Sequence, residues 1–302
     1  MCEMSVVFII LHYLTLSETC SCVESILSRS RGSAWHIVIV DNGSPNGSGE
    51  DLYRRYAEDS RITVILNAEN LGFARGCNVG ITYARSHFDP DFIAVCNNDT
   101  LLLSDGFASI LRQTWEETGF AVLGPRIETP DGRCDTNPYG GAEPASLARI
   151  EDRIRRETRS LRIAQSPILY AASRVRRCLK KAFSAAGRLP VWEKDTRSVQ
   201  ENMVLHGSFL VFSRTYFDHF DGFYDRTFLY NEEYILHYRV RRAGLRTIFQ
   251  PAIRVFHKED AATDDLRLSP RKKQVFLKKH SLDSLRVFAD LLREDVSGGR
   301  FF

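Results

Sequence analysis

Four short runs of β-branched and apolar residues alternate with helical patterns in the first third of the chain. The runs are Ser5–Leu11, His36–Val40, Ile62–Leu66 and Phe92–Cys96. Helical segments are predicted between them at Leu16–Leu27, Glu50–Ala57 and Gly72–Ala84. A continuous apolar strand is typical of burial on both faces, and strands that alternate with helices favour a parallel sheet. The sequence therefore predicts an α/β fold with a doubly wound, mainly parallel sheet flanked by helices.

Polar residues follow three of the predicted strands, where each strand ends. Tyr13, Asp41 and Asp99 stand at these positions. In open parallel sheets, ligands bind beyond the carboxyl ends of the strands. Polar residues also simply terminate strands, so this pattern alone leaves a binding site and ordinary strand ends equally open.

Three further features could carry chemistry. Asp99 follows two asparagines, and a hard divalent cation prefers carboxylate and amide oxygens. Glu232 and Glu233 are adjacent acids in an aromatic setting, which suits either a general base or the N-terminus of a helix. His257 ends an apolar run, where a metal ligand and a packed histidine are both open.

Several classes of protein are excluded by missing motifs. The first predicted strand is followed by Leu11-His12-Tyr13-Leu14 rather than by the glycine-rich turn of a nicotinamide enzyme, and no phosphate-binding P-loop occurs. The seven cysteines show no paired spacing, which favours free thiols over disulfides or a zinc site. No signal peptide or membrane span is visible, so we expect a cytoplasmic protein.

A basic segment interrupts the pattern from about residue 142 to residue 200. Between Arg149 and Arg188 it has twelve basic residues and three acidic ones. Leu169, Ala172, Val175, Leu179 and Phe183 recur at helical spacing, which predicts an amphipathic helix. The segment is either a solvated surface or a contact with an anionic membrane at the inner face of the plasma membrane. A predicted strand follows at Val204–Phe212, and a second basic helix at Arg271–Leu292.

Four motifs in the first hundred residues resemble glycosyltransferase family 2, which has the GT-A fold. They are VVFIILHY, IVIVDNGSPNGS, NLGFARGCNVGI and CNNDT, at Val6–Tyr13, Ile37–Ser48, Asn70–Ile81 and Cys96–Thr100. Three later runs agree with the family: His206–Arg214, Phe220–Gly244 and Phe249–His257. The resemblance thus covers most of the chain, from Ser5 to His257.

The resemblance implies a role for each matching residue. Tyr13 and Asp41 would hold the nucleobase. Asn70, Gly72 and Asn78 would shape the ribose and diphosphate pocket, and Asn97 and Asn98 would line the donor. Asp99, with His257, would bind Mg²⁺ or Mn²⁺, and Glu233 would be the catalytic base with Glu232 as its neighbour. Two positions depart from the family: Asn97 replaces the first aspartate of the metal motif, and Ile235 replaces an aspartate after the base.

The implied activity is inverting transfer of a sugar from a nucleotide-sugar donor to a glycan acceptor in polysaccharide biosynthesis. We expect dTDP-rhamnose or a UDP-hexose as donor and a lipid-linked or oligosaccharide acceptor. The expected domain spans residues 1–260 and includes the basic insertion, followed by a helical tail at 261–302. A non-catalytic relative that binds sugar nucleotides stays open. A nucleic-acid partner is not expected, because no groove-reading motif or aromatic platform accompanies the basic segment.

Overall fold

The computed structural model describes residues 4–29, 34–134, 136–140, 145–174, 195–259 and 269–298. The strands are β1 (Ser5–His12), β2 (Ala34–Asp41), β3 (Ile62–Leu66), β4 (Phe92–Asn97), β5 (Thr100–Leu102), β6 (Val122–Glu128), β7 (Gln200–Glu201), β8 (Phe209–Ser213) and β9 (Thr247–His257). The helices are α1 (Leu16–Arg29), α2 (Ser48–Tyr56), α3 (Phe73–His87), α4 (Phe107–Thr118), α5 (Leu147–Gln165), α7 (Arg214–Phe217), α8 (Glu232–Arg242) and α10 (Pro270–Gly298).

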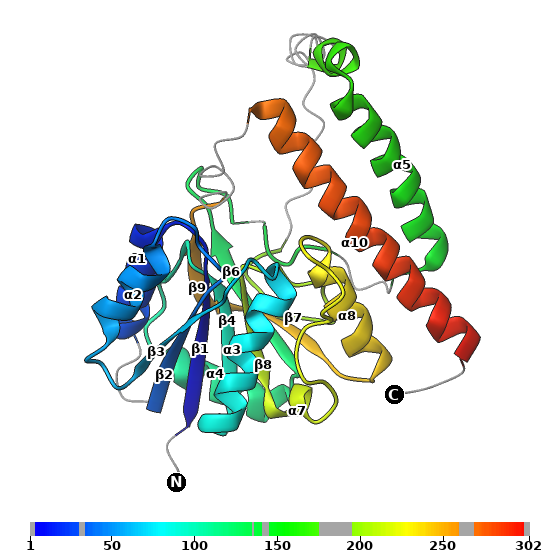
Figure 1. Ribbon diagram of the computed structural model, residues 1–302. Coiled ribbons are helices and arrows are strands. Elements are labelled where there is room, and N and C mark those ends of the chain that lie inside the picture. Colours follow the sequence, from blue (N-terminus) through cyan, green and yellow to red (C-terminus); the bar gives the residue numbers. More distant parts are fainter. Residues whose placement is uncertain are drawn as a thin grey trace.

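One mixed sheet forms the centre of the molecule, in the order β3-β2-β1-β4-β8-β6-β9-β5, with β7 paired to β9 (Figure 1). β3, β2, β1 and β4 are parallel, as predicted. β8 is antiparallel to both of its neighbours, β4 and β6, whereas β6 and β9 are parallel to each other. The predicted doubly wound, mainly parallel sheet is therefore confirmed, with β8 antiparallel at its centre and the short strands β5 and β7 antiparallel to β9.

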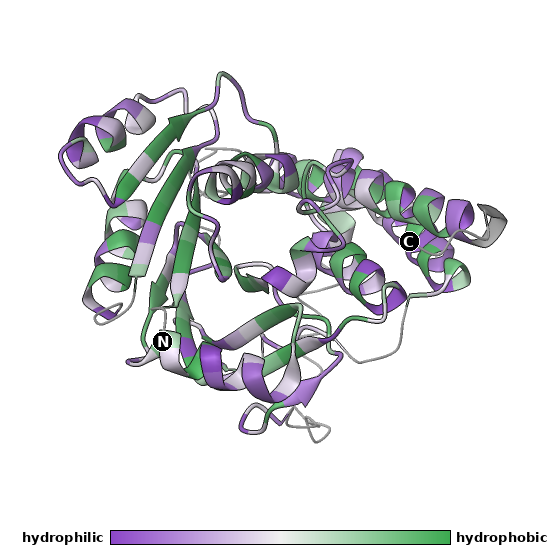
Figure 2. Ribbon diagram, turned by 90° about the horizontal axis from the view of Figure 1, so that it is seen from below, coloured by the Kyte–Doolittle hydropathy of each residue, from purple (hydrophilic) through white to green (hydrophobic). Residues whose placement is uncertain are grey.

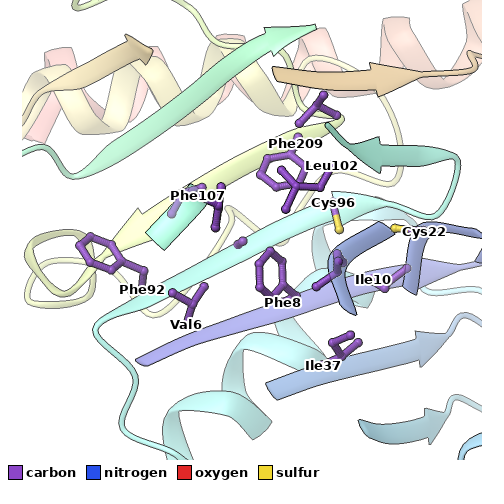
Figure 3. Packing of buried hydrophobic residues seen from close by; sticks show 14 of the residues in the cluster. Val6, Phe8, Ile10, Cys22, Ile37, Phe92, Cys96, Leu102, Phe107 and Phe209 are labelled. Carbon is purple, nitrogen blue, oxygen red and sulfur yellow. The ribbon is translucent and has the colours of Figure 1, made fainter. Parts of the chain in front are cut away.

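Alternate residues of β1 enter two different hydrophobic cores, because successive side chains of a strand point to opposite faces. Phe8 and Ile10 pack with α1, α2 and α4 on one face (Figure 3). Val7 and Ile9 pack with α3, α7 and α8 on the other. Figure 2 shows the hydrophobic strands between helices whose outer faces are hydrophilic. Helices thus cover both faces, which leaves the carboxyl ends of the parallel strands as the open edge.

The predicted strand that follows the basic segment starts later than expected. We predicted a strand at Val204–Phe212, but β8 begins at Phe209. Val204 instead forms an isolated bridge with Gly140, and a turn at Gly207 and Ser208 separates it from the strand. The turn carries His206 away from the sheet and into the neighbourhood of Asp99.

The basic insertion and the C-terminal tail pack together as two long antiparallel helices, α5 and α10 (Figure 1). The two helices are distant in the chain, and we call the pair the hairpin. Its base is an apolar cluster in which Ile150 of α5 and Phe288 of α10 meet Ile235 and Tyr238 of α8. The hairpin therefore rests on the helix that begins with the predicted catalytic pair. Of the predicted amphipathic helix, Leu169 and Ala172 lie in a helical turn at 167–174, whereas Val175, Leu179 and Phe183 lie outside the described residues.

Within the described part of the chain, no helix is long and apolar enough to cross a membrane. The described cysteines Cys20, Cys22, Cys77, Cys96 and Cys134 are free thiols, as predicted.

Candidate active site

The predicted binding residues meet at the carboxyl edge of three adjacent strands. In the strand register, His12 is the partner of Asp41 and Leu11 is the partner of Asn97. Tyr13, the residue after β1, therefore lies between the ends of β2 and β4. This edge brings together Tyr13, Asp41 and the Asn97–Asp99 turn, as the strand pattern predicted.

Asp41 is buried at the end of β2, where Ser44 holds its carboxylate. The Ser44 backbone N–H and hydroxyl both donate to it, the hydroxyl at 2.5 Å from Oδ1. Burial raises the pKa of Asp41, and the two Ser44 hydrogen bonds act in the opposite direction. Gly49 at the start of α2 stands against the same carboxylate, since a Cβ there would lie 2.4 Å from Oδ2. The carboxylate is thus fixed in place beside Tyr13.

A second loop is tied to this edge by asparagine amides. Asn42, which the sequence analysis did not single out, is buried and donates to Asn70 Oδ1 and to the Gly72 carbonyl. Gly72 has φ +81°, and a Cβ there would stand 2.3 Å from the Phe228 carbonyl oxygen. A larger residue at 72 would therefore clash with the backbone of the loop that precedes α8. Asn42 therefore holds Asn70 and Gly72 at this edge, and their contact with a donor stays a prediction.

Asn78 and Asn98 use their side-chain amides to join parts of the protein. The Asn78 amide exchanges two hydrogen bonds with the Phe223 backbone, at 2.9 and 2.8 Å. The Asn98 amide donates to the hydroxyls of Thr15 and Thr19 at the start of α1. Both side chains therefore fix loops around the site, and direct contact of either with a donor stays a prediction.

Asp99 and His257 are brought together by the pairing of β5 with β9, although 157 residues separate them in the chain. Thr100 is the register partner of His257, and His257 Nε2 lies 3.3 Å from Asp99 Oδ1. Both side chains are buried. The other ring nitrogen of His257, Nδ1, is buried and has no hydrogen-bond partner. Nδ1 is therefore not committed to a structural hydrogen bond.

These two donors fit a divalent cation that takes its other ligands from phosphate and water. Mg²⁺ and Mn²⁺ sites that serve nucleotides need only one or two protein ligands, because the phosphates supply the rest. The Asp99 carboxylate suits Mg²⁺ or Mn²⁺, and the His257 imidazole is a ligand for transition metals. The described residues contain no group of three or more His, Cys, Asp or Glu side chains that would form a metal cage of protein ligands alone.

His206 adds a residue that the sequence analysis did not assign to the site. The Asn97 backbone N–H donates to the Ser208 carbonyl, which places the 206–208 turn beside the Asp99 loop. The His206 and His257 ring centroids are 5.6 Å apart. Burial lowers the pKa of His206 to about 4, with the nearby His257 as a second cause. The Ser208 N–H donates to His206 Nδ1, so the neutral ring has its proton on Nε2.

The two glutamates at the start of α8 point into different surroundings. Glu233 lies against the 206–208 turn, since a Cβ on Gly207 would stand 2.8 Å from its Oε1. Burial raises the pKa of Glu233, whereas the Gly207 N–H and the positive charge of Arg153 lower it. Glu232 lies deeper, near Thr227 and Cys77, and its Oε1 has no hydrogen-bond partner. Burial, helped by the charge of Glu233, raises the pKa of Glu232 to about 8.

Aromatic rings and Arg153 line the space between Glu233 and the histidines. The Tyr139 ring lies 5.4 Å from His206 and 5.7 Å from Tyr234, centroid to centroid. The Arg153 guanidinium stands 4.6 Å above the Tyr234 ring and donates to Asn231 Oδ1. Asn231 and the preceding Tyr230 both have positive φ, at 68° and 71°. Non-glycine residues in this region are strained and cluster at functional sites.

The strand-edge residues of this site, from Tyr13 to Asp99, lie within the part of the chain that a family model matches. A family model described as glycosyl transferase family 2 matches residues 7–178, which is more than half of the chain. The chain belongs to glycosyltransferase family 2.

Curated relatives of this family-2 chain act on several sugars. It is 23% identical over 247 residues to an N-acetylglucosaminyl-diphospho-decaprenol L-rhamnosyltransferase of Mycobacterium tuberculosis, covering 75% of this chain and 67% of the relative. It is 22% identical over 223 residues to the low-salt glycan biosynthesis hexosyltransferase Agl10 of Haloferax volcanii, with shares of 74% and 58%. It is 27% identical over 112 residues to the glycosyltransferase GlyG of Streptococcus pneumoniae, covering 37% of this chain and 36% of the relative. The chain thus spans well under two thirds of the length of several relatives.

Two solved structures share the fold. GalNAc-T7 with UDP, GalNAc and Mn²⁺ matches with a TM-score of 0.56 and 12% identity over 99% of this chain and 58% of the other. Residues 1–349 of Staphylococcus aureus TarS match with a TM-score of 0.51 and 10% identity over 98% and 75%. The family-2 chain therefore has the GT-A fold, as its sequence motifs predicted.

Proposed function

We propose that this family-2 protein is an inverting glycosyltransferase that moves a sugar from a nucleotide diphosphate to a glycan acceptor. The observation that carries the proposal is that a carboxylate–imidazole pair and a second, buried carboxylate both lie near the turn at residues 206–208. His257, paired with Asp99, lies next to His206, and Glu233 lies against the following residue, Gly207. A donor diphosphate needs a cation to offset its negative charge, which the first pair could hold. An acceptor hydroxyl needs a base to remove its proton, which the second carboxylate could be.

The donor would lie along the carboxyl ends of β2, β1 and β4. Tyr13 and Asp41 would hold its base, with the loop at Asn70 and Gly72 and the amides of Asn97, Asn98 and Asn78 shaping the pocket around the ribose and diphosphate. Asp99 and His257 would hold Mg²⁺ or Mn²⁺. A bound cation would neutralise the negative charge that develops on the leaving diphosphate.

Glu233 would act as the general base of a single displacement. It removes the proton of the acceptor hydroxyl while the hydroxyl oxygen bonds to the anomeric carbon. The bond from that carbon to the phosphate oxygen breaks, and the nucleoside diphosphate leaves with the electron pair. Attack from the face opposite the diphosphate inverts the configuration. Glu232, protonated near neutral pH because of its raised pKa, would support Glu233 by not adding a second negative charge.

The relatives favour particular substrates. One is named for transfer of L-rhamnose to a diphospho-decaprenol-linked sugar, and another for hexosyl transfer. We therefore propose dTDP-rhamnose or a UDP-hexose as donor and a lipid-linked acceptor in polysaccharide biosynthesis. The protein would work in the cytoplasm, at the inner face of the plasma membrane.

A donor screen tests the proposal. The melting temperature is measured with dTDP-rhamnose, UDP-galactose, UDP-glucose and GDP-mannose, each with Mn²⁺ and again with EDTA. A ligand at a hundred times its dissociation constant stabilises the folded state by about 2.7 kcal/mol, so the correct donor will raise the melting temperature clearly. The rise will require Mn²⁺ and will be lost in Asp99→Asn. Stabilisation by none of the nucleotide sugars would contradict the proposal.

A further inference from the structure

The hairpin of α5 and α10 runs outward from the sheet, so its tip lies far from the strands (Figure 1). Its two helices are antiparallel, since Arg293 pairs with Glu151 near the base, Lys278 with Glu157 midway, and Arg271 donates to the Gln165 carbonyl at the tip. The apolar contacts of the hairpin with α8 lie at its base. The tip is therefore held away from the sheet by a stiff helical pair.

Two large apolar side chains are exposed at this tip. Ile168 is 80% exposed and Leu169 is 50% exposed, and they adjoin the exposed Ala171 and Ala172. Among the exposed large hydrophobic side chains of the described residues, Ile168 is the most exposed. Single exposed apolar residues are ordinary. Ile168 and Leu169, however, are adjacent and lie together at the end of a projecting hairpin.

The charged side chains around Ile168 and Leu169 are mainly basic. Residues 157–174 and 269–283, which form the tip half of the hairpin, have eight basic residues and two acidic ones, Glu157 and Asp283. The basic residues are Arg159, Arg162, Arg174, Arg271, Lys272, Lys273, Lys278 and Lys279. Within the described residues, no ion pair joins Arg159, Arg162, Arg174, Lys272 or Lys279 to a carboxylate. Among the described residues, the tip therefore presents exposed apolar side chains within a cluster of basic side chains.

We infer that the hairpin tip is a docking surface for an anionic lipid bilayer. Basic residues are attracted to anionic headgroups, while apolar side chains on the same element enter the interface between headgroups and acyl chains. Ile168 and Leu169 enter the interface, and the surrounding arginines and lysines contact the headgroups. Charge alone would suit other polyanions, whereas exposed apolar side chains within the charge select a bilayer.

The inference deepens the proposed function, on which its significance rests. A lipid-linked acceptor lies in the bilayer that the tip binds. At the other end of α5, Arg153 contacts Asn231 and Tyr234 beside Glu233. The hairpin thus joins the membrane surface to the acceptor side of the site. Membrane binding itself does not require transfer activity, so the two can fail separately.

Flotation with vesicles tests the inference. The full chain is mixed with phosphatidylcholine vesicles that contain or lack phosphatidylglycerol, at low and high salt. We expect binding only to the anionic vesicles, weaker at high salt because exposed charges are screened over about 8 Å at physiological ionic strength. No binding at low salt, or equal binding to neutral vesicles, would overturn the inference.

Matched variants locate the surface. Ile168→Ser with Leu169→Ser, and separately Arg162→Glu with Lys272→Glu, will each lower the bound fraction at least about tenfold. The control Tyr53→Ser with Val199→Ser removes large hydrophobic side chains that are 56% and 50% exposed elsewhere. The control Arg54→Glu with Arg55→Glu makes the same change of net charge on α2. Both controls will bind like the unmodified protein. Tip variants that bind like it, or controls that lose binding equally, would overturn the inference.

Donor hydrolysis without acceptor is measured in the same samples, with the melting temperature as a check on folding. All four variants will keep the rate of donor hydrolysis and the melting temperature of the unmodified protein, because their substituted residues are exposed and lie outside the site. Vesicle binding without any turnover of a nucleotide sugar would remove the proposed function and leave the docking surface standing. Turnover of a nucleotide sugar without vesicle binding would remove the docking surface and leave the proposed function standing.

Discussion

Gly207 and Glu233 are in contact across the site: a Cβ on residue 207 would stand 2.8 Å from Glu233 Oε1 and 3.3 Å from its carboxyl carbon. The backbone N–H of Gly207 also lowers the pKa of this carboxyl group. The turn that carries His206 therefore sets the position of Glu233. Glycine at 207 is needed because of this close approach rather than because of its backbone angles.

Gly207→Ala will displace the Glu233 carboxylate, because the added methyl group occupies its place. We expect kcat to fall roughly 10- to 100-fold, since small misplacements of catalytic groups have effects of this size. Steady-state kinetics with a donor and acceptor will measure it. Gly140→Ala is the matched control, because its Cβ would meet Val204 at an ordinary 3.6 Å. Equal activity of the two variants would contradict the contact.

Arg153→Gln will change the pH dependence of transfer. The positive charge of Arg153 lowers the pKa of Glu233, and a base must be deprotonated to act. Removal of the charge raises this pKa, so the acidic limb of the kcat/KM profile will move to higher pH. Arg153→Lys keeps the charge and will keep the limb near its original position. If the acidic limb of Arg153→Gln stays at the same pH, the charge of Arg153 does not act on the pKa of the catalytic base.

Glu232→Gln will change how stability depends on pH. Burial raises the pKa of Glu232 to about 8 in the folded protein, so the folded state holds a proton that the unfolded state releases above its ordinary pKa. Its contribution to stability is present at low pH and is lost as pH rises toward 8. The variant will match the unmodified protein near pH 5 and exceed it near pH 8, by about 1 kcal/mol or more. Denaturant melts at both pH values check this, and a constant difference would contradict it.

Asp99→Ala will abolish metal-dependent transfer and leave the fold intact, because it removes the carboxylate that faces His257. We expect a fall of about 100-fold or more, since metal stabilisation of developing charge is worth several kcal/mol. Transfer rates with Mn²⁺ and with EDTA will measure it. Turnover that is insensitive to both changes would remove Asp99 from the site.

The parallel half of the sheet was predictable because its strands are continuous apolar runs. β3 has the predicted bounds, and β1, β2 and β4 differ by one or two residues at their ends. The second half was not predictable in the same way. β8 is antiparallel between β4 and β6, and β5 and β7 have three and two residues, too few to show a period. These pairings depend on contacts between distant segments, which local composition does not record.

The site residues fall into the same two groups: those that local sequence predicts and those that depend on contacts between distant segments. Tyr13, Asp41 and Asp99 were found because they terminate apolar runs. His206 stood at the start of a recognised motif, yet its place beside His257 depends on the turn at Gly207 and on the hydrogen bond from Asn97 to Ser208. Arg153 was one basic residue among twelve. Only the packing of α5 on α8 distinguishes it from its neighbours.

The assignment of the general base is the centre of the account, and one assay tests it most directly. Transfer of sugar to acceptor is measured for Glu233→Gln and Glu232→Gln side by side, with donor affinity measured on the same samples. The account predicts that Glu233→Gln binds the donor normally but transfers at least about 100-fold more slowly, because its amide cannot accept the proton, while Glu232→Gln stays active. An active Glu233→Gln variant beside an inactive Glu232→Gln variant would contradict it.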